Sequence, residues 1–217
     1  MTTDIDIIYR LLKREYNTRN APIVGFQKIR GREPFRVLVG AILSSRTRDE
    51  TTGPVTKRFF TKIKKPDDIR RYSTEQLEKF IYPVGFYRTK AKRLKKLPEA
   101  MQKFDGKVPD TLEDLCSLPG VGRKVANLIL AEVFDKDAIC VDIHVHRISN
   151  RLGLVKTKTP EQTEKVLKEV LPRRYWKTWN PILVSHGQTI CTPQRPDCPD
   201  CPVEKQCKKT GVMDKCT

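Results

Sequence analysis

The chain has 217 residues, of which 38% are hydrophobic and 32% are charged, which excludes a disordered chain. Lysine and arginine total 43 against 26 acidic residues, so the formal net charge is +17. Such a surface attracts polyanions such as nucleic acid or anionic lipid, although a solvated basic face would give the same charge.

Nothing in the sequence predicts export or a membrane partner. The first twenty residues lack the basic stretch and apolar block of a signal peptide. The apolar runs at 37–43 and 138–141 are too short to cross a bilayer. We therefore expect an intracellular protein without a membrane anchor.

Helical signals follow one another along most of the chain, and no segment has the period-two pattern of a strand. The spacing of Ile5, Ile8 and Leu12 predicts an amphipathic helix. Segment 35–43 is apolar nearly all round and predicts a buried helix.

Two later helices are expected to begin with a capping box. Segments 73–76 (STEQ) and 159–162 (TPEQ) both have its form, and Pro160 stands at a first helical position. A short helix is expected to open at 109–111. Pro172 and Pro181 predict helix breaks.

Segment 118–124 (LPGVGRK) separates two short predicted helices. Gly120 and Gly122 allow the backbone to pass close to a ligand, and the following helix presents N–H groups that favour an anion such as a DNA phosphate. A tight turn between two helices is the alternative function of these glycines. Within so basic a chain, the pattern favours a helix–hairpin–helix that grips DNA.

Lys124 lies in the first turn of the second helix, beside Arg123. The helix dipole and the neighbouring cation should lower the pKa of its amine, and a neutral amine is what a Schiff-base nucleophile requires. Phosphate contact or solvation is the more common role of a single lysine, so this position alone does not identify a nucleophile.

Asp142 follows the apolar run 139–141, eighteen residues after Lys124. A partly desolvated carboxylate there could cap a helix, pair with a cation or take part in catalysis. His144 and His146 are two residues apart and do not share a helix face, so we expect structural or DNA-backbone roles for them and no metal.

Four of the seven cysteines lie close together in the pattern C-x6-C-x2-C-x5-C: Cys191, Cys198, Cys201 and Cys207. A reducing compartment argues against disulfides, and the prolines interleaved with these cysteines exclude a regular helix. The pattern predicts a loop held by a metal centre. A single C-x2-C pair suits an iron–sulfur cluster better than zinc, although the spacing does not exclude zinc.

Together these three motifs, in this order and spacing, resemble the endonuclease III family of helix–hairpin–helix DNA glycosylases. The resemblance extends over roughly 35–207, and segment 84–91 (VGFYRTKA) is similar to the family's second hairpin-like segment. It implies a bifunctional DNA glycosylase and abasic-site lyase of base excision repair that removes damaged, oxidised pyrimidines from double-stranded DNA. The protein is expected to be a monomer.

The resemblance implies a role for each matched residue. Lys124 corresponds to the nucleophile and Asp142 to the catalytic aspartate, and the four clustered cysteines correspond to the ligands of a 4Fe-4S cluster. The residues expected to contact DNA are Leu118, Gly120, Gly122, Arg123, Arg46 and Lys90.

The implied fold class is all-α, with two helical domains, a helix–hairpin–helix and a C-terminal cluster loop. Residues 27–136 would form a six-helix domain containing the hairpin at about 112–131. Residues 1–26 and 137–217 would form a discontinuous domain with the cluster at 191–207. Because no long N-terminal extension is present, we expect a prokaryotic, nucleoid-associated enzyme of the cytoplasm.

Two positions depart from the family's usual pattern. Arg46 stands where the family commonly has a glutamine that fills the gap left by a flipped base, and Ile143 stands where it usually has threonine. Lesion preference is therefore open. A monofunctional mismatch glycosylase and a non-catalytic DNA-binding module are the competing hypotheses.

Overall fold

The computed structural model describes residues 4–212. Over that range its regular secondary structure is helical throughout, with no strand, which confirms the all-α prediction. None of the helices among these residues has both the length and the hydropathy needed to cross a membrane. The chain forms two compact units: Gly25–Lys136, here the central unit, and the segments before and after it, here the terminal unit.

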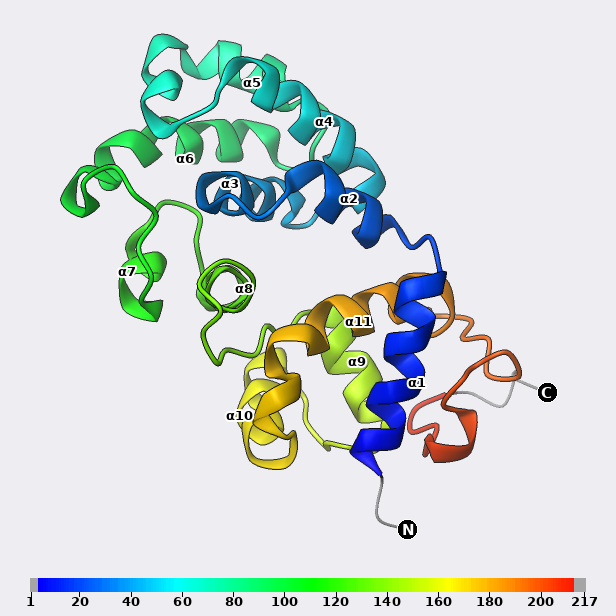
Figure 1. Cartoon of the computed structure of the whole chain (residues 1–217). Helices are drawn as coiled ribbons and strands as arrows, with labels where there is room; N and C mark the ends of the chain where they lie inside the picture. The colour runs from blue at the N-terminus through cyan, green and yellow to red at the C-terminus, as the bar shows by residue number, and fades with distance from the viewer. Residues whose placement is uncertain (1–3, 213–217) are drawn as a thin grey trace. The chain divides into compact units, whose positions relative to one another are not determined.

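The central unit is built around a buried helix. Helix α3 is packed by α4, α6 and α8 (Figure 1), and Phe35 and every residue of 37–43 are buried, which confirms the predicted buried helix. The Glu33 carboxylate caps α3 by accepting the N–H groups of Phe35 and Arg36. The main helices of this unit are α2 (Pro22–Arg30), α3 (Pro34–Ser44), α4 (Asp49–Lys62), α5 (Thr74–Ile81), α6 (Tyr87–Ala100), α7 (Leu112–Ser117) and α8 (Arg123–Glu132).

The terminal unit combines the first helix with the last third of the chain. Trp179 is fully buried and lies parallel to Tyr9, which in turn stacks on Tyr175 at 3.8 Å between ring centroids. The predicted N-terminal helix is confirmed. The helices are α1 (Ile5–Thr18), α9 (Ile143–Leu152), α10 (Pro160–Val170) and α11 (Trp176–Thr189), followed by a loop that contains only a short 3-10 turn at Glu204–Gln206.

The two predicted capping boxes differ in outcome. At the start of α5 the box is complete, since Ser73 and Gln76 each accept the other's backbone N–H. At the start of α10, Thr159 caps the N–H of Gln162, but the Gln162 side chain accepts from Lys158 instead. The prediction of a second complete box is therefore wrong, because the Gln162 side chain accepts the N–H of Lys158 and not that of Thr159.

The predicted break at Pro181 is also wrong. Pro181 lies inside α11, which continues to Thr189. Proline removes one helical hydrogen bond, but its neighbours Trp179, Ile182 and Leu183 are all buried in the core of the terminal unit. Tertiary packing on both sides therefore holds the helix through the proline.

Candidate functional site

Segment 118–124 forms a tight turn between α7 and α8. The Leu118 N–H donates to the Leu115 carbonyl, and the Leu118 carbonyl accepts the Val121 N–H, at 3.1 Å each. The Leu118 side chain is only 2% exposed. The expected contact of Leu118 with DNA is therefore not supported, because its side chain is in the core and both backbone groups are used inside the turn.

The absence of a side chain has a different physical effect at each of the two glycines of this turn. Gly120 has φ +86°, a conformation that L side chains rarely adopt, and a Cβ there would stand 3.0 Å from the Arg93 side chain. Gly122 has an ordinary extended φ, and a Cβ there would meet no atom within 4 Å. The first glycine is required by the turn itself, whereas the second keeps the outer surface open.

Helix α8 starts directly after Gly122 without a side-chain cap. Its first intrahelical bond runs from the Ala126 N–H to the Gly122 carbonyl, at 3.0 Å. Arg123 and Lys124 are exposed in the first turn. The N-terminal N–H groups of α8 and these two cations therefore form a surface that favours an anion.

Asp142 is the N-cap of α9. Its Oδ1 accepts the N–H groups of His144 and Val145, both at 2.9 Å, and the residue is half-buried. The carboxylate is therefore held in one orientation by the start of the helix. Lys124 belongs to the central unit and Asp142 to the terminal unit.

The histidines beside Asp142 make bonds within the protein. His144 Nδ1 lies 3.2 Å from Arg147 Nη2, and His146 Nδ1 lies 2.7 Å from Thr163 Oγ1. These contacts agree with the predicted structural role. Ile143, between Asp142 and His144, is 68% exposed.

Lys90 is not at the surface, contrary to its expected DNA contact. The residue is 3% exposed, and its amine donates to the carbonyls of Leu43 and Ser45 and to Thr47 Oγ1 at 2.7, 2.6 and 3.0 Å. Burial, followed by the positive charge of Arg93, lowers the pKa of Lys90 to about 8. The lysine is thus a structural anchor for the loop that carries Arg46.

Arg46 and Phe86 form an exposed pair that the motifs alone did not single out. The Arg46 guanidinium carbon lies 5.6 Å from the centroid of the Phe86 ring, and Phe86 is 62% exposed. An aromatic ring left in solvent beside a cation is a common device for stacking on bases. In the sequence, the signal that could have identified Phe86 is an aromatic residue within the hairpin-like segment 84–91.

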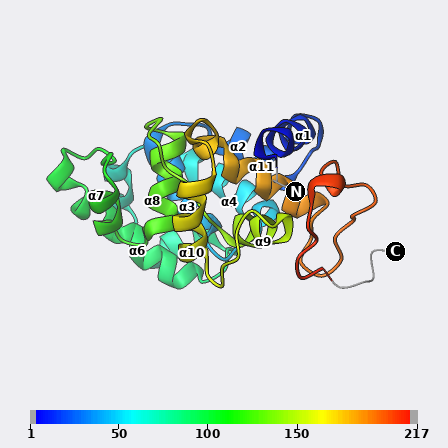
Figure 2. The same cartoon turned by 90° about the horizontal axis from the view of Figure 1, so that it is seen from below.

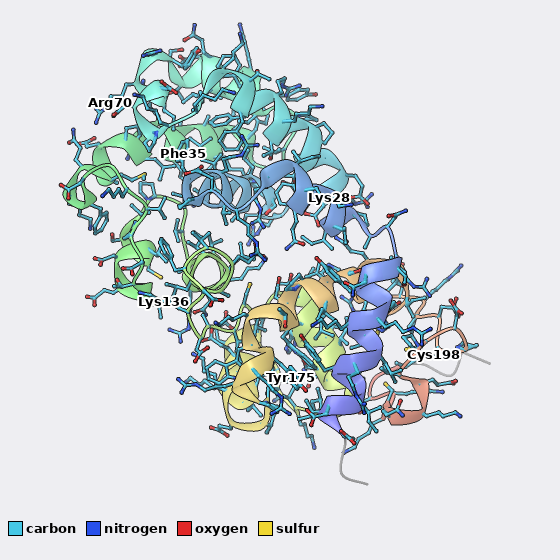
Figure 3. The ribbon with its side chains drawn as sticks, viewed as in Figure 1. Lys28, Phe35, Arg70, Lys136, Tyr175 and Cys198 are labelled. Carbon is cyan, nitrogen blue, oxygen red and sulfur yellow. The ribbon has the colours of Figure 1, made fainter. Side chains whose placement is uncertain are left out.

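The four clustered cysteines line a single cavity in the terminal unit, walled also by residues of α9 and α11. Figure 2 shows the loop that carries them as an orange-to-red segment, and Cys198 is labelled in Figure 3. No three Cys, His or acidic residues within 4–212 are arranged to hold a single metal ion. The cavity that these cysteines line is therefore the candidate metal centre of the terminal unit.

Hydrogen-bond donors are directed at these sulfur atoms. Arg151 Nη1 lies 3.3 Å from Cys191 Sγ, and the Lys209 N–H lies 3.3 Å from Cys207 Sγ. His186 Nε2 also lies 3.7 Å from Cys201 Sγ, and its Nδ1 lies 2.7 Å from Glu15 Oε2. Donors of this kind stabilise thiolates. These donors thus suit thiolates bound to a soft metal centre.

Arg151 attaches the cysteine loop to α9. The residue is 7% exposed, and its guanidinium donates to the carbonyls of Thr192 and Pro193, both at 2.7 Å. These bonds satisfy carbonyls that a proline-rich loop cannot pair internally. No motif of the sequence identified Arg151. Its only signal is an arginine that directly precedes Leu152 on a helix whose apolar residues are spaced for burial.

Burial raises the pKa of Cys201 to about 12 and also raises that of Cys207. Buried thiols of this kind ionise only when a cation replaces the proton. The chemistry of the four residues therefore fits a metal centre.

Comparison with known proteins identifies the chain. Residues 39–173 match the HhH-GPD superfamily of base excision DNA repair proteins. A relative from Thermotoga maritima named endonuclease III is 46% identical over 177 residues, which cover 81% of this chain and 83% of the relative. The chain belongs to the endonuclease III family.

Other members of the family agree. Endonuclease III of Bacillus subtilis is 36% identical over 184 residues and is covered to 84%. A solved structure of a trapped endonuclease III–DNA covalent intermediate has a TM-score of 0.84 at 33% identity and covers 96% of this chain. The predicted family is confirmed, and the chain is a DNA glycosylase and abasic-site lyase of base excision repair.

The two hairpin glycines should respond differently to alanine. Gly120→Ala places a Cβ in the left-handed region against Arg93, so unfolding should become easier by about 1–2 kcal/mol. Gly122→Ala should leave the free energy of unfolding within about 0.5 kcal/mol of the wild type. Urea unfolding of both variants measures this difference, and equal losses would contradict it.

Proposed function

We propose that Lys124 is the nucleophile and Asp142 the catalytic carboxylate of a bifunctional reaction on damaged, oxidised pyrimidines in double-stranded DNA. The observation that supports this most directly is the position of Lys124, exposed in the first turn of α8 directly after the open glycine. Similarity to a family member trapped covalently on DNA supports it further. The central and terminal units would be the two domains of the family.

The hairpin would hold the DNA backbone. N–H groups at the start of α8 favour a phosphate, and the absence of a side chain at Gly122 lets that phosphate approach closely. Contacts to phosphate carry no base preference, so they would place any damaged nucleotide in the same register. Lys124, two residues further on, would then lie near the sugar of the bound strand.

The chemistry begins when the damaged nucleotide has left the stack. The neutral Lys124 amine forms a bond to C1′ of the sugar, the N-glycosidic bond breaks, and the base leaves with the bonding electrons and a proton. The start of α8 and the charge of Arg123 both disfavour a positive charge on this amine, which helps the neutral form. The remaining N–H proton then passes to O4′ as the C1′–O4′ bond breaks, and ring opening leaves a Schiff base between Nζ and C1′.

Strand cleavage follows from that Schiff base. The imine makes the C2′ protons acidic, so a base removes one of them and the bond from C3′ to its phosphate oxygen breaks by β-elimination. Hydrolysis of the imine then releases Lys124. Asp142 would stabilise the positive charge that develops on the sugar and assist proton movement, with its carboxylate already oriented by the cap of α9.

We further propose that Cys191, Cys198, Cys201 and Cys207 hold a 4Fe-4S cluster. The four cysteines line one cavity and contain a single C-x2-C pair, a spacing that suits a cubane better than one zinc ion. When bound, the cluster supplies a structural cross-link of the loop. The donors from Arg151 and the Lys209 backbone would stabilise its thiolates.

Borohydride trapping tests the nucleophile. The wild type should form a covalent adduct with an oxidised-pyrimidine duplex, and Lys124→Ala should form none, because no imine is left to reduce. Lys136→Ala, which removes another exposed lysine of the central unit, is the control and should trap normally. A wild type that removes bases without an adduct would instead be a monofunctional glycosylase.

Asp142→Asn tests the carboxylate without removing the cap. Asparagine caps helices about as well as aspartate, so thermal unfolding should be nearly unchanged. Base removal under single-turnover conditions should fall by about 10²-fold or more, because the charge is lost. An unchanged rate would reject the catalytic role of Asp142.

Metal analysis tests the cluster. Protein purified without oxygen should contain iron and acid-labile sulfide and show the broad visible absorbance of iron bound by thiolates. Cys198→Ser should lose most of both, and its 191–207 segment should become sensitive to protease. Cys116→Ser, at an exposed cysteine outside the cavity, should keep the cluster; stoichiometric zinc in the wild type would contradict the proposal.

A further inference from the structure

The Lys90 amine is a buried cation that binds the last turn of α3 and the loop that follows it. It has three acceptors at 2.6–3.0 Å: Leu43 O, Ser45 O and Thr47 Oγ1. An ammonium group has three N–H donors, so the acceptors match its full capacity. Burying a cation is costly, and an apolar side chain of similar length would fill the same space without that cost.

The loop that Lys90 holds is strained at Arg46. This residue has φ +53°, a left-handed conformation that residues other than glycine rarely adopt and that is strained for them. Two of the Lys90 bonds reach the residues immediately before and after Arg46, Ser45 and Thr47. The strain persists because both flanks are fixed.

Gly85 supports the same loop independently. Its N–H donates to Thr47 Oγ1 at 3.0 Å, and a Cβ at this position would stand 2.7 Å from the Arg46 carbonyl oxygen. The absence of a side chain thus lets the loop pack directly against segment 84–91. Phe86, the next residue, is the ring that the Arg46 guanidinium faces.

These contacts therefore connect the buried Lys90 amine to the exposed Arg46 side chain. Lys90 itself is 3% exposed and does not reach the surface, whereas Arg46 and Phe86 do. We propose that Lys90 is a positioning residue of the base-removal step, which fixes the 44–48 loop so that Arg46 meets the DNA in one conformation. This inference rests on the proposed glycosylase function.

A double-mutant cycle tests whether Lys90 acts through Arg46. Lys90→Met, Arg46→Ala and the double variant are compared by single-turnover base removal from an oxidised-pyrimidine duplex. Each single variant should be slower by about ten- to a hundred-fold, because small misplacements of contact residues have effects of this size. The double variant should be no slower than Arg46→Ala alone.

Lys95→Met is the matched control. Lys95 lies on the same helix and donates to the carbonyls of Arg70 and Tyr72 at 3.1 and 2.6 Å, so it anchors a different loop by the same chemistry. Its rate of base removal should stay within about two-fold of the wild type, which is the expectation for a distant site. If removal of any loop-anchoring lysine on α6 lowered the rate of base removal, Lys95→Met would be slower too.

Gly85→Ala keeps the test independent of the buried charge. Its Cβ would displace the Arg46 carbonyl, so Gly85→Ala should slow base removal by the same factor of about ten- to a hundred-fold as Lys90→Met. In an Arg46→Ala background, Gly85→Ala should slow base removal no further. This variant decides the question if Lys90→Met does not fold.

Additive losses in both cycles, or full activity of Lys90→Met and Gly85→Ala, would overturn the inference. The wild type is assayed in parallel for base removal and for the borohydride adduct. If the wild type removes no base, the proposed function fails; if it does and the cycles are additive, only the role of Lys90 fails.

Discussion

A helix that is apolar on nearly every side has to be enclosed by other helices, and α3 places this constraint on the central unit. Helices α4, α6 and α8 pack against it, so each is held along its length. The C-terminal end of α3 leads into the Arg46 loop, and α8 carries the glycine turn at its start. The Arg46 loop and the start of α8, which we propose contact DNA, thus both depend on one buried helix.

Features governed by neighbouring residues could be predicted from the sequence. The buried helix α3, the N-terminal helix and the complete cap at Ser73 follow from apolar spacing and from side chains three residues apart. The glycine turn follows in the same way, because a positive φ at Gly120 is a local demand of the backbone. Such signals are contained within one or two helical turns of chain.

Features governed by distant residues could not be predicted in this way. Lys90 was expected to contact DNA because segment 84–91 is similar to the family's second hairpin-like segment, but its three acceptors come from residues more than forty positions earlier. Pro181 was expected to end a helix, and core packing prevented that. The spacing of the cysteines predicted a metal loop, yet the contributions of Arg151 and of the buried pair Glu15–His186, 171 residues apart, need the folded chain.

The composition of the terminal unit has a consequence for synthesis on the ribosome. Helix α1 is made first, but the core residues it packs against, such as Trp179 and Leu183, are made more than 150 residues later. The central unit, by contrast, is one continuous segment and can complete its own core as soon as it has emerged. The apolar face of the nascent amphipathic α1 therefore stays uncovered until α11 has been translated, and chaperones can bind it during that interval.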